Sequence, residues 1–290
     1  MKTKRLILNA AMFLMAASVT FTSCRKDRDN DNDTSGAEDN ALADKSFEDV
    51  GQISSEAANG SVGTYKVGGD HDGILSVCAT VTHDTALNTI LIDFGTTNCL
   101  CNDGRYRRGK IYVSYSNTSK PEPYFYWDSL TQITITTSPT DNYFVNDNQV
   151  IGTKTIVNNG HNTAGHMNWT VVVNGQIIKA NNQGTISWTT NRNHEWLAGE
   201  NTPFIWADDE HGVTGTSSGT SAKGTAFNVT ITSQLVRKIA CPKHFVSGTF
   251  DFTPGTKPVR HVDFSPPSNG ACDNIATVTI NGKTYTVTMK

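Results

Sequence analysis

The chain has 290 residues, with 24 Lys and Arg against 27 Asp and Glu, and 37% of its residues are hydrophobic. This length accommodates one large domain or two small ones, and the apolar share suffices for a folded core, which excludes a wholly disordered chain. A net charge of −3 gives no basic footprint for nucleic acid, so we expect no nucleic-acid partner. Only the N-terminal segment carries a long apolar run, which excludes a protein with several membrane-spanning helices.

Residues 1–23 have the order of a secretory signal peptide. Basic residues at positions 2, 4 and 5 precede a mostly apolar segment over 6–21, and two small residues then lead to Cys24. A cysteine directly after small residues resembles the lipobox of bacterial lipoproteins, in which the cysteine becomes the acylated N-terminus. We therefore predict lipidation of Cys24 and an outer-membrane protein, lipid-anchored and either periplasmic or surface-exposed. Cleavage near Ala17, with Cys24 unmodified, is the alternative.

Residues 24–60 are predicted to form a disordered tether. The segment is rich in Asp, Asn, Ser, Ala and Glu, and this composition buries too little apolar surface to offset the loss of chain entropy. A flexible coil of this length would reach roughly 35 Å and would stand the domain clear of a membrane. The acidic stretch after Cys24 is similar to the export signal of surface lipoproteins in Bacteroidetes-type bacteria, and a solvated charge run is the alternative.

Residues 61–290 alternate between apolar and polar positions and predict one all-β domain. Residues 90, 92 and 94 share one apolar face, as do residues 227, 229 and 231. Asn281-Gly282 between two alternating runs predicts a hairpin, because both residues accept the positive φ of a type I′ turn, and Asn174-Gly175 is interpreted in the same way. We expect an antiparallel fold, either a two-sheet sandwich or a long curved meander, since the helical crossovers of a parallel sheet are missing.

Two stretches of this domain resemble each other. Asp93-Phe94 is followed by Cys101-Asn102-Asp103, and Asp263-Phe264 is followed by Cys272-Asp273-Asn274. The similarity predicts two pseudo-repeated β modules, each with an earlier cysteine of its own. Chance similarity among strands rich in Gly, Asn and Thr is the alternative.

The cysteines of the domain are expected to form disulfides, which exported chains use more often than cysteine metal sites. The repeat places one early and one late cysteine in each module, which predicts a Cys241–Cys272 bond and a bond from Cys78 to the Cys99/Cys101 pair. It favours Cys101 as the partner of Cys78, leaving Cys99 free. Because Cys99-x-Cys101 lacks the second close pair of a zinc ribbon, we expect no metal.

Several segments resemble a group of Bacteroidetes-type outer-envelope lipoproteins: Cys99–Gly104, Asn142–Asn146, Gly152–Thr155 and the closing Cys272–Gly282. The resemblance covers nearly all of the predicted domain. The group has no assigned activity, so the resemblance implies a lipid anchor and an all-β architecture, and it supplies no catalytic residues.

The segment from His194 to His211 concentrates acids and aromatic residues, and its candidate ligand residues are Trp196, Trp206, Asp208 and Asp209. Aromatic faces beside carboxylates suit glycan binding, and two carboxylates flanking a sugar form a glycosidase arrangement. The alternative, which we favour, is that the tryptophans pack in the core or across strands while the acids lie in a solvated loop.

Two further motifs are weaker. Asp84-Thr85-Ala86 and Asp128-Ser129-Leu130 resemble the acceptor of Bacteroidetes-type periplasmic O-glycosylation, which makes Thr85 and Ser129 candidate acceptors. Asp70–Gly73 is more typical of a turn than of a metal loop.

The sequence contains no catalytic template of the common kinds, so we predict neither enzymatic activity nor a cofactor. The predicted function is that of an envelope or cell-surface lipoprotein acting as a structural or interaction module. Its partners would be the membrane, through the N-terminal lipid, and a glycan or an envelope protein. The alternatives are a glycan-binding surface protein and, less favoured, a glycoside hydrolase.

Overall fold

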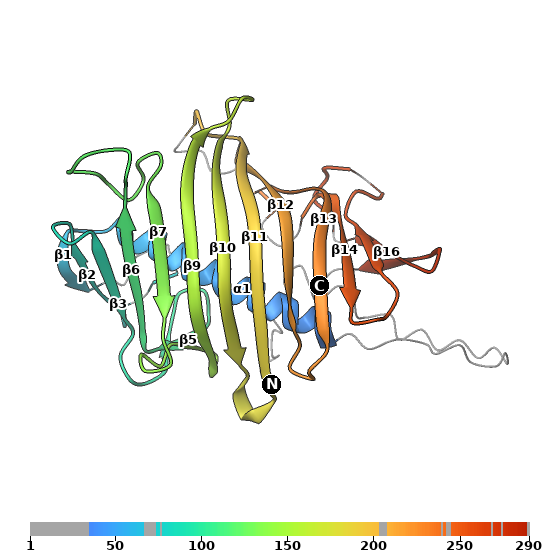
Figure 1. The fold of residues 1–290 in the computed structure, drawn as a ribbon, viewed down its shortest axis with the longest axis horizontal. Coiled ribbons are helices and arrows are strands. Elements are labelled where there is room, and N and C mark those ends of the chain that lie inside the picture. Colours follow the sequence, from blue (N-terminus) through green and yellow to red (C-terminus); the bar gives the residue numbers. More distant parts are fainter. Residues whose placement is uncertain are drawn as a thin grey trace.

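The computed structural model describes residues 35–66, 74–75, 77–202, 208–238, 240–241, 245–267, 269–273 and 275–288. Within these ranges one α-helix crosses the face of a broad antiparallel β-sheet (Figure 1). The predicted signal peptide, the lipidation site Cys24 and the predicted turn Asp70–Gly73 lie outside the described residues.

The elements follow one another along the chain with few long connections. In chain order they are α1 (Ser35–Ala58), β1 (Gly63–Lys66), β2 (Thr80–Asp84), β3 (Thr89–Asp93), β4 (Cys99–Leu100), β5 (Tyr106–Arg108), β6 (Lys110–Ser116), β7 (Gln132–Thr137), β8 (Phe144–Val145), β9 (Asn148–His161), β10 (Met167–Ile178), the 3₁₀-helix η2 (Ala180–Asn182), β11 (Thr185–Ala198), β12 (Glu210–Thr220), β13 (Ala226–Lys238), β14 (Ser247–Pro254), β15 (Arg260–Asp263), β16 (Ile275–Ile280) and β17 (Lys283–Thr288).

The sheet has the strand order of a meander. Neighbouring strands pair antiparallel in the order β1-β2-β3-β6-β7-β9-β10-β11-β12-β13-β14-β15-β16-β17, while β4, β5 and β8 form a side ladder that joins β9. The prediction of an antiparallel all-β fold is therefore confirmed.

The pairing does not reproduce the predicted pseudo-repeat. Strand β3 pairs directly with β6, whereas β16 lies between β15 and β17. The last strand of the first stretch, β6, is therefore a direct neighbour of its first strand, β3. The last strand of the second stretch, β17, is separated from its first strand, β15, by β16. Their similarity reflects shared turn and strand composition rather than two modules built alike.

The two faces of the sheet differ as the alternation predicts. On β11, Ile186, Trp188 and Thr190 are buried, while the residues between them are exposed. We call the face with the buried residues, which α1 covers, the inner face. The opposite, hydroxyl-rich face is the outer face.

The predicted disordered tether over residues 24–60 is wrong from Ser35 onward. The 24-residue helix α1 buries Phe47, Val50 and Ile53 against the inner face. Polar residues of the helix such as Asp49 and Ser54 are buried as well. The helix therefore looks solvated in its composition, although it forms part of the core.

Two glycines make room for the helix. Gly175, which the sequence assigned to a hairpin, lies in the middle of β10 opposite Gly152 of β9. A Cβ atom on Gly175 would collide with the ring of Phe47, which stacks on Trp188 with 5.9 Å between ring centroids. The hairpin predicted at Asn281-Gly282 is confirmed between β16 and β17, and both of its residues have positive φ.

Acidic side chains of α1 pair with cations of the sheet and its connections along the length of the helix. Lys179 Nζ lies 2.9 Å from Asp39 Oδ1, Arg192 Nη1 lies 2.7 Å from Asp44 Oδ1, and Lys154 Nζ lies 3.3 Å from Glu48 Oε2. These pairs fix the position of the helix on strands that are distant from it in sequence.

The most buried charges lie farther along the helix. The carboxylate of Asp49 pairs with Arg105, and its Oδ2 lies 3.6 Å from Nη2 of Arg107, whose side chain has no exposure. Arg107 also donates to both carboxylate oxygens of Asp103, each at 2.7 Å. Such a cluster is stable only while every charge keeps its partner.

Two disulfides close loops within the sheet. The predicted Cys241–Cys272 bond is confirmed, with 5.5 Å between the Cα atoms. Cys78 pairs with Cys99, with 6.0 Å between Cα atoms, so the preference for Cys101 is wrong. Cys101 is a free, buried cysteine in the hydrophobic core, whereas Cys99 is only partly buried at the start of β4.

We expect Asp49→Asn to destabilise the protein by about 3–5 kcal/mol, because it removes the carboxylate that pairs with the buried guanidinium of Arg105, while Arg107 keeps its pair with Asp103. The matched control is Asp44→Asn, since 37% of the Asp44 side chain is exposed and solvent screens its pair with Arg192. That change should cost less than about 1 kcal/mol. Urea unfolding of both variants measures the difference, and equal losses would contradict the importance of the buried cluster.

Candidate functional site

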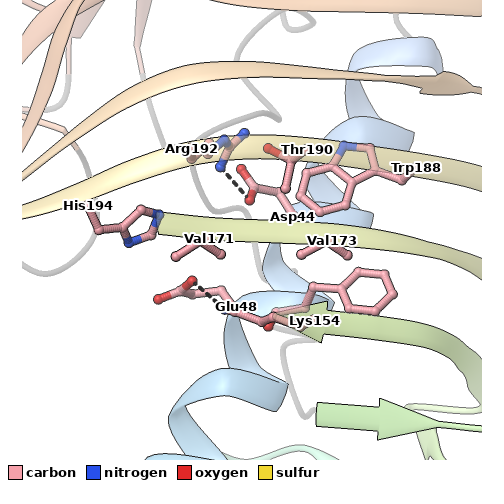
Figure 2. A pocket seen from close by; sticks show the side chains of 10 residues that line it. Asp44, Glu48, Lys154, Val171, Val173, Trp188, Thr190, Arg192 and His194 are labelled. Atoms are coloured by element: carbon pink, nitrogen blue, oxygen red, sulfur yellow. Dashed lines mark hydrogen bonds and ion pairs between the residues drawn. The ribbon is translucent and has the colours of Figure 1, made fainter. Parts of the chain in front are cut away.

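A small recess lies between α1 and strands β9, β10 and β11 (Figure 2). Its walls combine charged side chains from the helix and the sheet with Val171, Val173 and Trp188. The free volume is about 10 Å³, which is about the space for one water molecule. The recess therefore suits a bound water rather than an organic ligand.

The charges around the recess balance one another. Attraction by Lys154 lowers the pKa of Glu48 to about 2, although 38% of the Glu48 side chain stays exposed and solvent screens the pair. Desolvation lowers the pKa of His194 to about 4, and the nearby Lys154 and Arg192 lower it further against the opposing effect of Glu48. At neutral pH Glu48 is ionised and His194 is neutral, so the recess belongs to the ionic contact that holds the helix.

The predicted ligand segment from His194 to His211 is only partly a loop, because β11 extends to Ala198 and β12 begins at Glu210. Trp196 is half-buried, and its ring stacks on His211 with 5.7 Å between centroids. Its indole Nε1 donates to Asp209 Oδ1 at 3.3 Å. The structure thus brings Trp196 and Asp209 together.

The other two predicted ligand residues do not join this pair. Asp208 is exposed and accepts a hydrogen bond from Thr202 Oγ1 at 2.7 Å. Trp206 lies outside the described residues. Gly199 allows Asp209 to approach the chain closely, because a Cβ atom there would collide with the Asp209 carboxylate.

Glu195, a further acid of this segment, is held by side chains from neighbouring strands and turns. Its carboxylate pairs with His166 at 2.8 Å and accepts hydrogen bonds from Asn162 at 2.7 Å and Gln234 at 2.8 Å. Desolvation opposes ionisation, but these bonds dominate and lower the pKa of Glu195. A hydrolytic proton donor needs a raised pKa, so Glu195 is suited to linking strands rather than to that role.

Sequence reasoning missed the connection between β6 and β7, residues 117–131, which we call the aromatic loop. It joins the upper ends of these strands in Figure 1. Phe125 is 61% exposed, Trp127 46% and Leu130 48%, whereas Tyr126 is buried. The Tyr126 hydroxyl shares a 2.8 Å hydrogen bond with Ser54 of α1. One ring therefore fixes the loop to the helix while its neighbours face solvent.

Hydrogen bonds within the domain engage several backbone groups of this loop. Backbone carbonyl oxygens accept from side chains, and backbone N–H groups donate to acceptors in the loop or on β9: Asn117 Nδ2 to Ser129 O at 2.9 Å, Thr131 Oγ1 to Phe125 O at 3.1 Å, Asn158 Nδ2 to Trp127 O at 3.0 Å, Phe125 N to Asp128 Oδ2 at 2.8 Å, and Leu130 N to Asn158 O at 2.7 Å. The loop is thus held in one conformation by its own bonds.

Leu130 has an unfavourable backbone conformation. Its φ is +65°, in the left-handed region that a branched aliphatic residue seldom adopts, and its side chain is nevertheless exposed. Residues held in such conformations concentrate at functional sites. In the sequence, the run of four aromatic residues at positions 124–127 was the available signal for this surface.

A further exposed apolar side chain, Leu87, lies at the end of the sheet that carries the aromatic loop. Because β3 runs antiparallel to β6, the turn between β2 and β3 lies at the end of the sheet that carries the aromatic loop. Leu87 of that turn is 71% exposed, and the adjacent Asn88 donates to Glu122 Oε1 at 2.9 Å and to the Tyr124 hydroxyl at 3.2 Å. We call Leu87, Phe125, Trp127 and Leu130 the apolar tip.

Both candidate O-glycosylation residues are accessible. Thr85 is exposed in the turn between β2 and β3, where Asp84 Oδ1 accepts from the backbone N–H of Ala86 at 2.9 Å and of Leu87 at 3.0 Å. Ser129 is exposed in the aromatic loop. Accessibility is a condition for modification, and the modification itself stays a prediction.

Among the described residues, no group of three or more His, Cys, Asp or Glu side chains is placed to hold a metal ion. In the same part of the chain, no helix is long and apolar enough to cross a membrane. Comparison with protein-family models, with curated proteins and with solved structures finds no match. The functional conclusion therefore depends on the residues and geometry of this chain.

Proposed function

We propose that this protein is a lipid-anchored lipoprotein of the cell envelope that acts as an interaction module, with the aromatic loop as its contact surface. The observation that supports this proposal is the exposure of Phe125, Trp127 and Leu130 on a loop that is fixed from within. Large apolar side chains gathered on a surface mark interaction sites. A loop that is already ordered loses little entropy when it binds.

The rest of the domain offers little space for a ligand, which agrees with this role. Helix α1 covers the inner face, and the recess beside it has room for about one water. Leu130 keeps a 48% exposed apolar side chain in a left-handed backbone conformation, which lowers stability. A contact with a partner would compensate for that loss.

The proposed location is supported by the order of the N-terminal sequence and by the two disulfides. Cys78–Cys99 and Cys241–Cys272 suit an oxidising compartment outside the cytoplasm. Several acyl chains on Cys24 would hold the protein stably at a membrane, where a single chain would not.

We expect Cys24→Ala to move the protein from the membrane fraction to the periplasmic or culture-soluble fraction, because the acceptor of the lipid is removed. Mass spectrometry of the wild-type mature protein should find an acylated N-terminus at Cys24. The matched control is Cys101→Ser, which removes the free cysteine and should leave the protein in the membrane fraction. An unmodified N-terminus at any other residue would refute the anchor.

The contact surface is tested by photo-crosslinking in intact cells. Phe125→p-benzoylphenylalanine should give a covalent adduct with lipid or protein, since the side chain points to the proposed partner. The control, Val172→p-benzoylphenylalanine, places the probe at a 41% exposed position of the outer face and should give several-fold less adduct. Equal capture at both positions would argue against the aromatic loop as the contact.

Glycan binding near Trp196 is the second candidate function. The half-buried Trp196, its stacking on His211 and its hydrogen bond to Asp209 combine a ring and a carboxylate as sugar sites do. A glycan array tests this candidate: signals lost in Trp196→Ala but kept in Trp127→Ala would support it, and an array without signals would remove it. A glycoside hydrolase stays the least favoured function, since the lowered pKa of Glu195 does not suit a proton donor.

A further inference from the structure

The apolar tip has the chemistry of a surface that enters hydrocarbon. Its exposed side chains are two aromatic rings and two leucines, from Leu87, Phe125, Trp127 and Leu130. Hydrocarbon supplies no hydrogen bonds, so a loop that enters it must satisfy its own backbone groups. In the aromatic loop the Phe125 N–H and carbonyl, the Trp127 carbonyl and the Leu130 N–H are all bonded within the domain.

A protein partner makes a different demand. Protein interfaces carry about one hydrogen bond per 100–200 Å² between the partners. Several polar groups of the tip are engaged internally, including Asp128, which accepts from Phe125 N at 2.8 Å and pairs with Lys120 at 2.6 Å. Aromatic residues also favour the boundary between lipid headgroups and hydrocarbon. The tip thus fits a lipid surface better than a protein surface.

The length of chain before the helix keeps the domain close to the proposed anchor. Ten residues, Arg25 to Thr34, separate Cys24 from Ser35, and they span at most roughly 35 Å. The helix itself is about 36 Å long, and Ser54 near its far end is bonded to Tyr126 of the aromatic loop. A domain lying along the membrane can therefore place the tip on the same bilayer as the anchor.

The charged groups beside the tip have no net positive charge. Lys120 pairs with Asp128, and Glu122 accepts from the neutral amide of Asn88 at 2.9 Å and keeps its own negative charge. Attraction to anionic headgroups is therefore not expected, and the contact depends on burial of apolar surface.

We propose that the apolar tip docks on the lipid bilayer that carries the anchor, inserting Phe125 and Trp127 at the headgroup boundary. This inference rests on the proposed function, because it names the partner of the same loop. It gives the protein two contacts with the membrane: the acylated Cys24, which ten residues separate from α1 in the sequence, and the apolar tip, which is bonded to Ser54 near the end of α1 through Tyr126.

Vesicle flotation tests the lipid contact without the anchor. The mature chain with Cys24→Ala should float with vesicles of phosphatidylcholine, and adding Phe125→Ser with Trp127→Ser should lower the bound fraction at least tenfold. The control adds Tyr112→Ser with Val172→Ser, which remove two exposed apolar side chains from the outer face and should leave flotation unchanged. Matched thermal unfolding curves show that all variants keep the fold, since Tyr126 is retained.

Each remaining outcome decides the inference. Flotation that is unchanged by phosphatidylglycerol and by salt supports apolar docking, whereas binding that appears only with the anionic lipid overturns it. Absence of flotation, or equal flotation of the two double variants, also overturns it. A chain that fails to float but captures a protein through position 125 retains the interaction module and loses the lipid partner, so the two proposals fail separately.

Discussion

The fold depends on the pairing of acidic groups on α1 with cations of the sheet. The buried pair of Asp49 with Arg105 and the exposed-edge pair of Asp44 with Arg192 fix the direction in which the helix crosses the strands. Hydrophobic burial of Phe47, Val50 and Ile53 supplies a non-directional attraction. The charges supply the register, because a shift of the helix along the inner face would separate them and leave buried groups unpaired.

Local sequence patterns predict the strands well and the helix poorly. The alternation of Phe227 and Val229 on β13 and the Asn281-Gly282 turn are each defined within a few residues of sequence, so both were predicted. Helix α1 is not defined by its local sequence. Its residues Asp39 and Asn40 have the composition of a solvated segment, and their partners Lys179 and Trp188 lie about 140 residues later in the chain. The turn predicted at Gly175 was wrong for the same reason. A glycine is needed there because a Cβ atom would collide with the ring of Phe47, which is distant in sequence.

The candidate sites also differ in whether local sequence reveals them. Trp196 and Asp209 were found because acids and aromatic residues lie close together in sequence, and the structure brings these two into contact. The apolar tip was missed because hydrophobic side chains in a sequence suggest a core. Only the structure shows that Tyr126 turns inward to α1 while Phe125 and Trp127 face solvent. Exposure is decided by the partner of each ring, which the sequence does not reveal.

The long separation between the helix and its partners sets the order in which the domain can be completed. Asp39 bonds the backbone of Ala222, and Asn40 bonds Ser217, at sequence separations of 183 and 177 residues. During synthesis the helix precedes these partners, which follow more than a hundred residues later. Contacts this distant in sequence form slowly. Helix α1 therefore lacks these partners until β12 and the connection to β13 have formed, so late segments of the chain complete the burial of the first helix.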